Sequence, residues 1–385
     1  MLTRSKVQGM VVGGAIGDAV GKPVETWTPE KILEVHPDGV RKYLSPQGHK
    51  WFPDDDPPGD TTDDEQLKTA IMTGLIEGKE AAEKLPVGNE PCGFDGFDEY
   101  HKAIAASHVA ALKESDAGWG NTTREAVKKI ANNCPWHKAG AELNFGGTGN
   151  GVPMKVAPWA AWSGSPAAKL FMSDQDFRFN QEIVRHAAMT HATDISAWAG
   201  VIHVAAVNFC LWSGISQYKT DDFLALVAEQ VFEWGEPSHS SETVSYNLEH
   251  LRQHPTEEED SLEHRMLWLF RERGRLSGAG GSFTTEERDE LREKFGKGSC
   301  YVLNSLPFTY AYFIKNPYTP QTIIDVVEAG GDTDTNASMV GEMIGALMGI
   351  EAFQTDDWQW MIDGLLCYDR LIEMSDLFCD TFGIE

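Results

Sequence analysis

The sequence has little positive charge for its length. Lys and Arg number 32 and Asp and Glu number 59 among 385 residues, so the formal net charge at pH 7 is −27. Because nucleic-acid-binding proteins neutralise phosphates with Lys and Arg, this balance excludes a surface built to bind a duplex. An anionic substrate then needs a local counter-charge, and bound cations are the obvious source.

Cysteine is scarce, and long apolar runs are missing. The cysteines are scattered without a C-x-x-C pair, at Cys92, Cys134, Cys210, Cys300, Cys367 and Cys379. This spacing excludes a zinc framework and a disulfide scaffold, and it favours the reduced thiols of a cytoplasm. A bilayer span needs about 20 apolar residues, and no run approaches that length, so we expect no membrane contact.

The first residues look like a short signal sequence, because Arg4 and Lys6 precede the apolar stretch "VQGMVVGGAIG". Asp18 and the lack of a small-x-small cleavage site argue against export. We therefore expect a cytoplasmic protein.

Helical periodicity dominates, and no alternating series of the kind that predicts strands is present. Helices are expected over residues 7–25, 61–79, 98–114, 195–212, 220–234, 318–331 and 361–378. In the second of these, Thr62 is expected to cap the helix with Glu65 as its capping-box partner, and Leu67, Ile71 and Leu75 mark one apolar face. The sequence thus predicts an all-α fold.

Glycine recurs at every fourth position in two stretches, residues 7–25 and residues 330–349, and the second stretch is also expected to form a helix. The positions are Gly9, Gly13, Gly17 and Gly21 in the first, and Gly341, Gly345 and Gly349 in the second. Each glycine inside a helix costs about 1 kcal/mol relative to alanine. A face of small residues lets two helix backbones approach closely. We expect two tightly packed inner helices that hold their polar ends at a fixed place.

Two charged or flexible segments are expected to be surface insertions in a single domain of residues 1–385. One runs from about Gly78 to Phe94, and the other from about Gln253 to Gly298 around the stretch "SGAGGS".

Acidic residues gather at two expected helix starts, "TTDD" at Thr61–Asp64 and "DTDT" at Asp332–Thr335. Capping explains one such cluster, because helix N-termini favour negative charge. Two clusters, each with two carboxylates and a hydroxyl, exceed what capping requires. If they lie together, their charges repel, and Mg²⁺ or Mn²⁺ with oxygen ligands would relieve the repulsion.

Two other interpretations compete for the second acidic cluster. As an EF-hand loop it fails, because Ala337 and Met343 stand where glycine and glutamate are needed. A two-aspartate phosphatase loop would follow a buried strand, whereas "TIIDVVEAGG" before the cluster predicts a helix and a turn. An unrelated metal enzyme, such as a phosphoester hydrolase, stays open as an alternative.

Two further stretches carry polar groups. "FGGTGNGVPMKVAP", Phe145–Pro158, offers backbone amides for phosphate or ribose oxygens, but it lacks the spacing of either dinucleotide-binding fingerprint. "MTHATD" places His191 at a helix entrance, where a histidine is more often structural than catalytic.

Together these motifs resemble the ADP-ribosylglycohydrolase family. Five matches, in family order, carry the resemblance: "GGAIGDAVGKPVE", "GDTTDDEQL", "GTGNGVPMKVAP", "THATD" and "EAGGDTDTNASMVGEMIGALMG". They extend from Gly13 to Gly349 and so span most of the chain. Two departures from the family pattern are Glu65, where many members have threonine, and Lys155, where arginine is usual.

The resemblance implies an all-α domain with two divalent cations, Mg²⁺ or Mn²⁺, in a central cleft. The implied metal ligands are Thr62, Asp63, Asp64, Asp332, Asp334 and Thr335. The implied substrate-binding residues are Glu25, Gly149, Asn150, Gly151, Met154 and His191, and the implied catalytic residues are Glu25, Asp63 and Asp64.

The implied activity is metal-dependent hydrolysis of the bond between ADP-ribose and a modified protein side chain, with arginine as the favoured linkage. The implied partners are an ADP-ribosylated protein, ADP-ribose and a cognate ADP-ribosyltransferase or toxin. The alternative is a protein on the same scaffold that binds ADP-ribose, or blocks a toxin as an immunity protein does, with or without hydrolysis.

Overall fold

The described residues fold into helices. The computed structural model describes residues 1–85, 94–142, 146–171, 176–235, 261–277 and 281–385. In chain order its elements are α1 Arg4–Gly21, η1 Lys22–Val24, α2 Pro29–Val35, α3 Asp63–Glu83, α4 Phe94–Glu114, α5 Asn121–Ala131, η2 Trp136–Lys138, α6 Ala157–Ser163, α7 Pro166–Phe171, α8 Asp176–Ala187, α9 Asp194–Trp212, α10 Thr220–Gly235, α12 Leu262–Leu276, α13 Thr285–Lys294, η6 Gly296–Gly298, α14 Val302–Lys315, α15 Gln321–Glu328, α16 Thr333–Met348, η7 Ile350–Phe353, α17 Gln359–Asp363 and α18 Tyr368–Phe382. In these ranges the only β-type pairs are two isolated bridges, Ala141 with His191 and Gly149 with Tyr301. The predicted all-α class is confirmed.

Helices α1 and α16 pack against each other along their glycine faces. A methyl group added to Gly345 would lie 1.8 Å from the carbonyl oxygen of Gly9, and one added to Gly341 would lie 2.0 Å from that of Gly13. At the far end, one added to Gly21 would lie 2.4 Å from the carbonyl oxygen of Thr333. The expected close approach of two inner helices is confirmed, and it brings the end of α1 to the start of α16.

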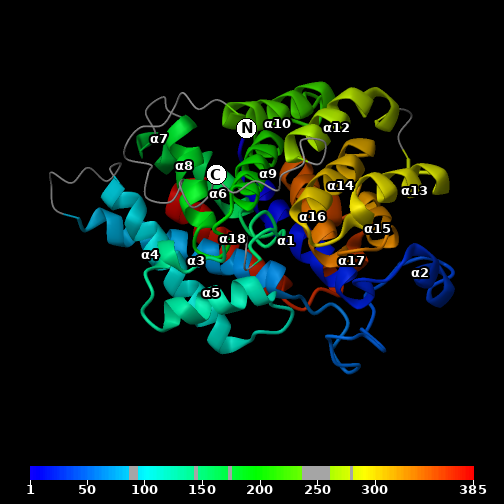
Figure 1. The fold of residues 1–385 in the computed structure, drawn as a ribbon, viewed down its shortest axis with the longest axis horizontal. Helices are drawn as coiled ribbons and strands as arrows, with labels where there is room; N and C mark the ends of the chain where they lie inside the picture. The colour runs from blue at the N-terminus through cyan, green and yellow to red at the C-terminus, as the bar shows by residue number, and fades with distance from the viewer. Residues whose placement is uncertain (86–93, 143–145, 172–175, 236–260, 278–280) are drawn as a thin grey trace.

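The other helices surround this central pair. Helices α3, α4 and α5 lie on one side of it, and α12, α13 and α15 lie on the other (Figure 1). Helix α16 also contacts α9 and α14. The two ends of the chain meet, because the Arg4 backbone N–H donates to the Glu385 carbonyl at 2.7 Å.

Several expected helix boundaries differ from the structure, and two of the differences have a clear physical cause. The helix expected over 7–25 ends at Gly21, because Pro23 follows and the chain continues as the short 3₁₀ turn η1. The helix expected over 361–378 is interrupted between α17 and α18. At this break the Leu366 N–H donates to the Gly59 carbonyl at 3.1 Å, so a bond to another segment replaces a helical one.

The described parts of the two expected surface insertions are mostly helical, and some of their residues pack against neighbouring helices. Gly78 lies inside α3, where an added methyl would come within 2.6 Å of the Tyr100 Cα on α4. In the second segment, Leu262, Met266 and Leu269 of α12 are buried in the main core. Whether these segments are surface insertions stays a prediction, and residues 86–93, 253–260 and 278–280 lie outside the described residues. The single-domain organisation stays a prediction.

Helix α9 is the one described helix that is long and apolar enough by length and composition to cross a membrane. Of its most apolar 18-residue window, 72% is buried inside the protein, where α9 contacts α6, α8, α10 and α16. Its composition therefore fits a core helix, and the expected lack of membrane contact stays a prediction.

Candidate metal centre

The start of α3 is held by a carboxylate from α1. Thr62 is the N-cap, as expected, and its hydroxyl accepts the Asp64 N–H at 3.3 Å. The expected capping box is wrong: the Thr62 and Glu65 N–H groups both donate to Asp18, at 3.0 and 3.1 Å. The Glu65 side chain instead accepts from Arg370 at 2.8 Å. Asp18 thus fixes the acidic start of α3 against α1.

The start of α16 is set by a glycine turn. Gly330 and Gly331 have φ values of 71° and 97°, which side chains other than glycine rarely tolerate. After this turn the Asp332 N–H donates to the Gly298 carbonyl at 2.9 Å. Asp332 is the residue that precedes the first turn of α16, and Asp334 lies within that turn.

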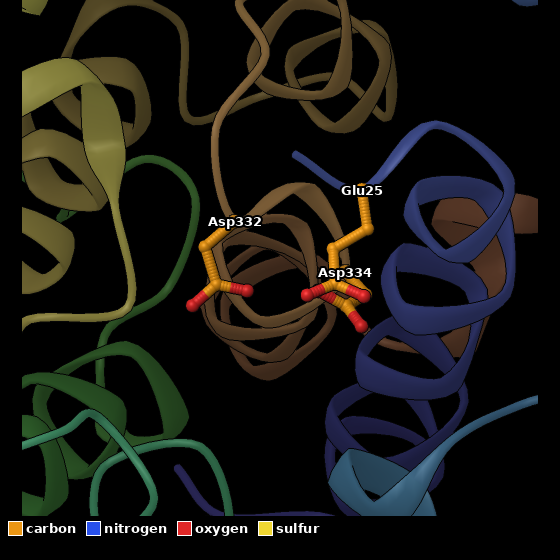
Figure 2. A group of neighbouring side chains, drawn as sticks. All are labelled: Glu25, Asp332 and Asp334. Carbon is orange, nitrogen blue, oxygen red and sulfur yellow. The ribbon is translucent and has the colours of Figure 1, made fainter. Parts of the chain in front are cut away.

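The acidic segments that are far apart in the sequence converge at one place. Carboxylate oxygens of Glu25, Asp332 and Asp334 all lie within 4.8 Å of one another. Figure 2 shows the Glu25 and Asp334 carboxylates side by side, with Asp332 at the same end of α16. The Thr335 hydroxyl donates to Asp64 at 3.1 Å, which joins the starts of α3 and α16. Ligand candidates from both helices therefore face one centre.

Burial raises the pKa of every acid in this centre, and repulsion between neighbouring carboxylates adds to the rise for most of them. Burial, followed by the charges of Asp332, Asp63 and Asp18, raises the pKa of Glu25 to about 9. Burial and then the charge of Asp18 raise the pKa of Asp63 to about 7. Asp64, Asp332 and Asp334 are shifted in the same direction, chiefly by burial. The nearby lysines therefore do not offset the cost of burying these carboxylates.

The residues fit a hard divalent cation. The donor set is carboxylate and hydroxyl oxygen, which suits Mg²⁺ or Mn²⁺. The Asp64 Oδ1 atom is buried and has no hydrogen-bond partner. A buried carboxylate oxygen without a partner is costly, and a bound cation would satisfy it.

The metal-free protein is expected to lose stability as the pH rises from about 5 to about 8. Asp18 and Asp63, with pKa values raised to about 6 and about 7, keep their protons in the folded state. In the unfolded chain an aspartate has a pKa of about 3.9, so it has already lost its proton in this range. The folded state therefore binds more protons than the unfolded state, so stability falls as the pH rises through these values, and Glu25, with its pKa raised to about 9, adds to the fall.

The expected loss is on the order of 3 kcal/mol, measured as the free energy of unfolding in urea with a chelator present. Added Mg²⁺ or Mn²⁺ at about pH 8 should restore it, because a ligand that binds only the folded state stabilises that state. A metal-free protein that gains stability across this range would contradict the placement of these acids.

Asn150 in the glycine-rich loop orients Asp332. Its side-chain Nδ2 donates to the Asp332 carboxylate at 2.7 Å and to the Ser305 hydroxyl at 3.0 Å, and its backbone N–H donates to the Cys300 carbonyl at 2.9 Å. Asn150 is 5% exposed. In this structure it therefore holds a candidate ligand in place, and its contact with substrate stays a prediction.

Other residues of the expected substrate site lie behind the loop. A methyl group added to Gly151 would be 2.6 Å from the His191 ring, so this histidine packs against the loop backbone next to Gly149. Burial, then the Lys155 charge, lowers the pKa of His191 to about 3, which makes the ring neutral. Met154 packs in a small apolar cluster that includes Leu67. The substrate-binding roles of these residues stay predictions.

The Lys155 side chain points into the protein interior and not toward solvent. Its ammonium is fully buried and donates to the Thr190 hydroxyl at 3.0 Å, and burial lowers its pKa to about 7. It is therefore a buried group bonded to Thr190 rather than an exposed cation. Phe145, at the start of the same stretch, lies outside the described residues.

Sequence reasoning missed Asp18 as part of the centre. The signal was present, because Asp18 is a charged residue in an otherwise apolar glycine-striped helix. It also missed the segment at Gly118 and Gly120: an added methyl at Gly118 would lie 3.1 Å from Asp63 Oδ1, and the Gly120 N–H lowers the pKa of Asp63. No motif in the sequence marked that segment.

Comparisons with known proteins agree with this architecture. The chain is 25% identical to "ADP-ribosylhydrolase ARH3" of Mus musculus, over 94% of this chain and 88% of that protein. The identity with the Homo sapiens protein of the same name is also 25%, over 94% and 90%. A solved structure described as "ADP-ribosylglycohydrolase-related protein complex" superposes with a TM-score of 0.63 at 20% identity over 98% of both chains, which shows the shared fold.

A model of the ADP-ribosylglycohydrolase family matches residues 1–382, nearly the whole chain. All five motifs that carry the resemblance lie within that match, and four of them, all except "THATD", contribute side chains to the acidic centre or to its immediate support. The family is generally dependent on divalent metal ions, and the acidic group of Glu25, Asp332 and Asp334 is available for such an ion. The chain therefore belongs to the ADP-ribosylglycohydrolase family and is a hydrolase that acts on ADP-ribosyl bonds.

Proposed function

We propose that this protein removes ADP-ribose from modified arginine side chains with the help of two Mg²⁺ or Mn²⁺ ions bound at the acidic centre. The observation that carries the proposal is the convergence of Glu25 with the starts of α3 and α16, joined by the Thr335–Asp64 hydrogen bond. Six carboxylates in one buried place have no evident use in a protein that merely packs its helices.

The candidate ligands lie on two rigid helix starts. In this proposal Thr62, Asp63 and Asp64 hold the ions from α3, and Asp332, Asp334 and Thr335 hold them from α16. Bound divalent ions would clamp the vicinal hydroxyls of the distal ribose and lower the pKa of a water. Asn150, through its hydrogen bond to Asp332, keeps one ligand in a single orientation.

Glu25 is the candidate proton-transfer residue. It follows the short turn η1 rather than lying within a helix, and it is the least buried member of the acidic group. Its raised pKa, about 9, means that it holds a proton near neutral pH when the centre is empty of cations. A carboxyl group so placed can position the sugar and pass a proton to the leaving nitrogen.

The arginine linkage is proposed from charge. A guanidinium leaving group is cationic, and the sequence has a net charge of −27, so the acidic surroundings of the centre favour its approach over that of a neutral hydroxyl. We further propose that the protein acts in the cytoplasm, because the five described cysteines are unpaired thiols.

The test is a panel of arginine-, serine- and aspartate-linked ADP-ribosyl substrates, assayed for ADP-ribose release with and without Mg²⁺ or Mn²⁺. We expect release from the arginine-linked substrate, at least about 100-fold slower after chelation. Faster release from serine would replace the proposed linkage, and release that ignores chelation would contradict the metal centre.

Binding without turnover on all substrates would identify an ADP-ribose-binding protein instead. In that case, protection against a cognate transferase or toxin would have to survive loss of the metal ligands. Phosphate release from a phosphoester panel would point to a different hydrolase.

A further inference from the structure

A second polar layer lies one helical turn behind the acidic centre. It contains Lys68, four residues after Asp64 on α3, and Ser338, four residues after Asp334 on α16. Residues four apart lie on the same face of a helix. The layer therefore runs parallel to the candidate metal ligands and is separated from them by a single turn.

Lys68 is the cation of this layer and is held by Glu342. The Lys68 Nζ lies 2.5 Å from Glu342 Oε1 and donates to the Ser338 hydroxyl at 2.9 Å. The two charged side chains are 1% and 0% exposed. The other Glu342 oxygen bonds to His203 Nε2 at 2.8 Å, and His203 Nδ1 lies 3.2 Å from the Tyr310 hydroxyl. Glu342 is thus fixed from both sides.

Helix α1 leaves room for Lys68 and Glu342, because it has a glycine where it passes them. A methyl group added to Gly14 would lie 2.4 Å from Lys68 Nζ and 2.9 Å from the Glu342 Cγ. Gly14 lies four residues before Asp18 on the same helix. Helices α1, α3 and α16 therefore each place one residue in the acidic layer and another, one turn away, in the layer behind it.

Lys68 has the means to reach the acidic layer. Side chains in an α-helix lean toward its N-terminus, which for α3 is the end that carries Asp63 and Asp64. The Lys68 charge already acts on Asp64 and Asp18, lowering the pKa of both against the larger effect of burial. Asp64 Oδ1 has no hydrogen-bond partner and is a ready acceptor for an ammonium.

We propose that Glu342 is a positioning residue that holds the Lys68 ammonium one turn behind the acidic centre and so keeps this internal cation from replacing the divalent ions. The inference rests on the proposed metal centre. A lysine released from Glu342 would bind the same carboxylates that the metal ions need, and it would compete with them at an effective concentration set by its tether.

The test measures the affinity for Mn²⁺ by titration calorimetry and by electron paramagnetic resonance. Glu342→Gln keeps the side-chain shape and removes the charge that holds Lys68. We expect its Mn²⁺ affinity to fall by at least about tenfold. The double variant Glu342→Gln with Lys68→Met removes the competing cation, and its Mn²⁺ affinity should return to within about threefold of the original.

The control is Glu83→Gln at the other end of α3. Its carboxylate pairs with Lys79 at 2.6 Å but is 55% exposed, so this variant should bind Mn²⁺ as the original protein does. If Glu342→Gln fails to fold, Glu342→Asp replaces it, because it keeps the charge and shortens the reach. Adding Lys68→Met to Glu342→Asp should then raise the Mn²⁺ affinity.

The outcomes separate the two proposals. A wild-type protein that binds no Mn²⁺ removes the metal centre itself. Wild-type binding with an unchanged Glu342→Gln overturns the positioning role alone. An affinity loss that Lys68→Met does not restore also overturns it, because Glu342 would then act through packing rather than by restraining the lysine.

Discussion

Asp334→Asn is expected to lower ADP-ribose release by more than about 100-fold while the protein stays folded. Asp334 lies in the first turn of α16, and its carboxylate is grouped with those of Glu25 and Asp332. Asparagine has nearly the same shape but lacks the negative charge that binds a divalent cation. Burial, followed by the charges of Glu25 and Asp332, raises the pKa of Asp334 well above its usual value, so this change also relieves repulsion.

The same variant should therefore be more stable than the original protein when metal is absent. This pairing of lost activity with gained metal-free stability separates a functional acid from a structural one. The measurements are single-turnover release and thermal melting with a chelator. Asp325→Asn is the matched control, because Asp325 is a partly buried acid on α15 that pairs with Gln321 at 2.9 Å, away from the centre. Wild-type-like turnover by Asp334→Asn would defeat the assignment.

Gly345→Ala is expected to destabilise the protein by about 4 kcal/mol or more. The added methyl would lie 1.8 Å from the Gly9 carbonyl oxygen and 2.1 Å from its carbon. Both obstacles are backbone atoms of a buried helix, so neither can move aside as a side chain can. The intrinsic gain of about 1 kcal/mol from replacing a helical glycine with alanine is far too small to compensate.

Gly274→Ala tests the same substitution without the contact. Gly274 lies within α12, and an added methyl there meets nothing within 4 Å, so this variant should gain about 0.5–1 kcal/mol. The free energies of unfolding of both variants would be measured by urea denaturation. Equal effects for the two variants would show that the glycine faces are not needed for packing.

Periodic features could be read from the sequence because they are local. The four-residue glycine spacing was enough to predict two closely packed helices, since a small-residue face has few other uses. The acidic starts of α3 and α16 were also visible, because helix starts have their own residue preferences. Where these two starts meet in space depends on all the intervening packing, and only the resemblance to a family joined them.

The misses involve contacts between segments that are far apart. Asp18 caps α3 from another helix, so the local capping-box pattern of Thr62 and Glu65 was a false signal. Likewise α17 and α18 are separated by a bond from Leu366 to Gly59, which no periodicity reports. Met154 and His191 are buried in this structure, and no local pattern in their motifs indicated that burial; their contact with substrate stays a prediction.

The pairing of α1 with α16 has a consequence for how the protein is made. Gly9 and Gly345 are far apart in the sequence, so α1 leaves the ribosome long before the helix with which it pairs. Contacts of such long sequence separation form slowly. Until that contact forms, the glycine face of α1 has no partner. A nascent chain in this state is open to misassembly with neighbouring copies or to capture by chaperones.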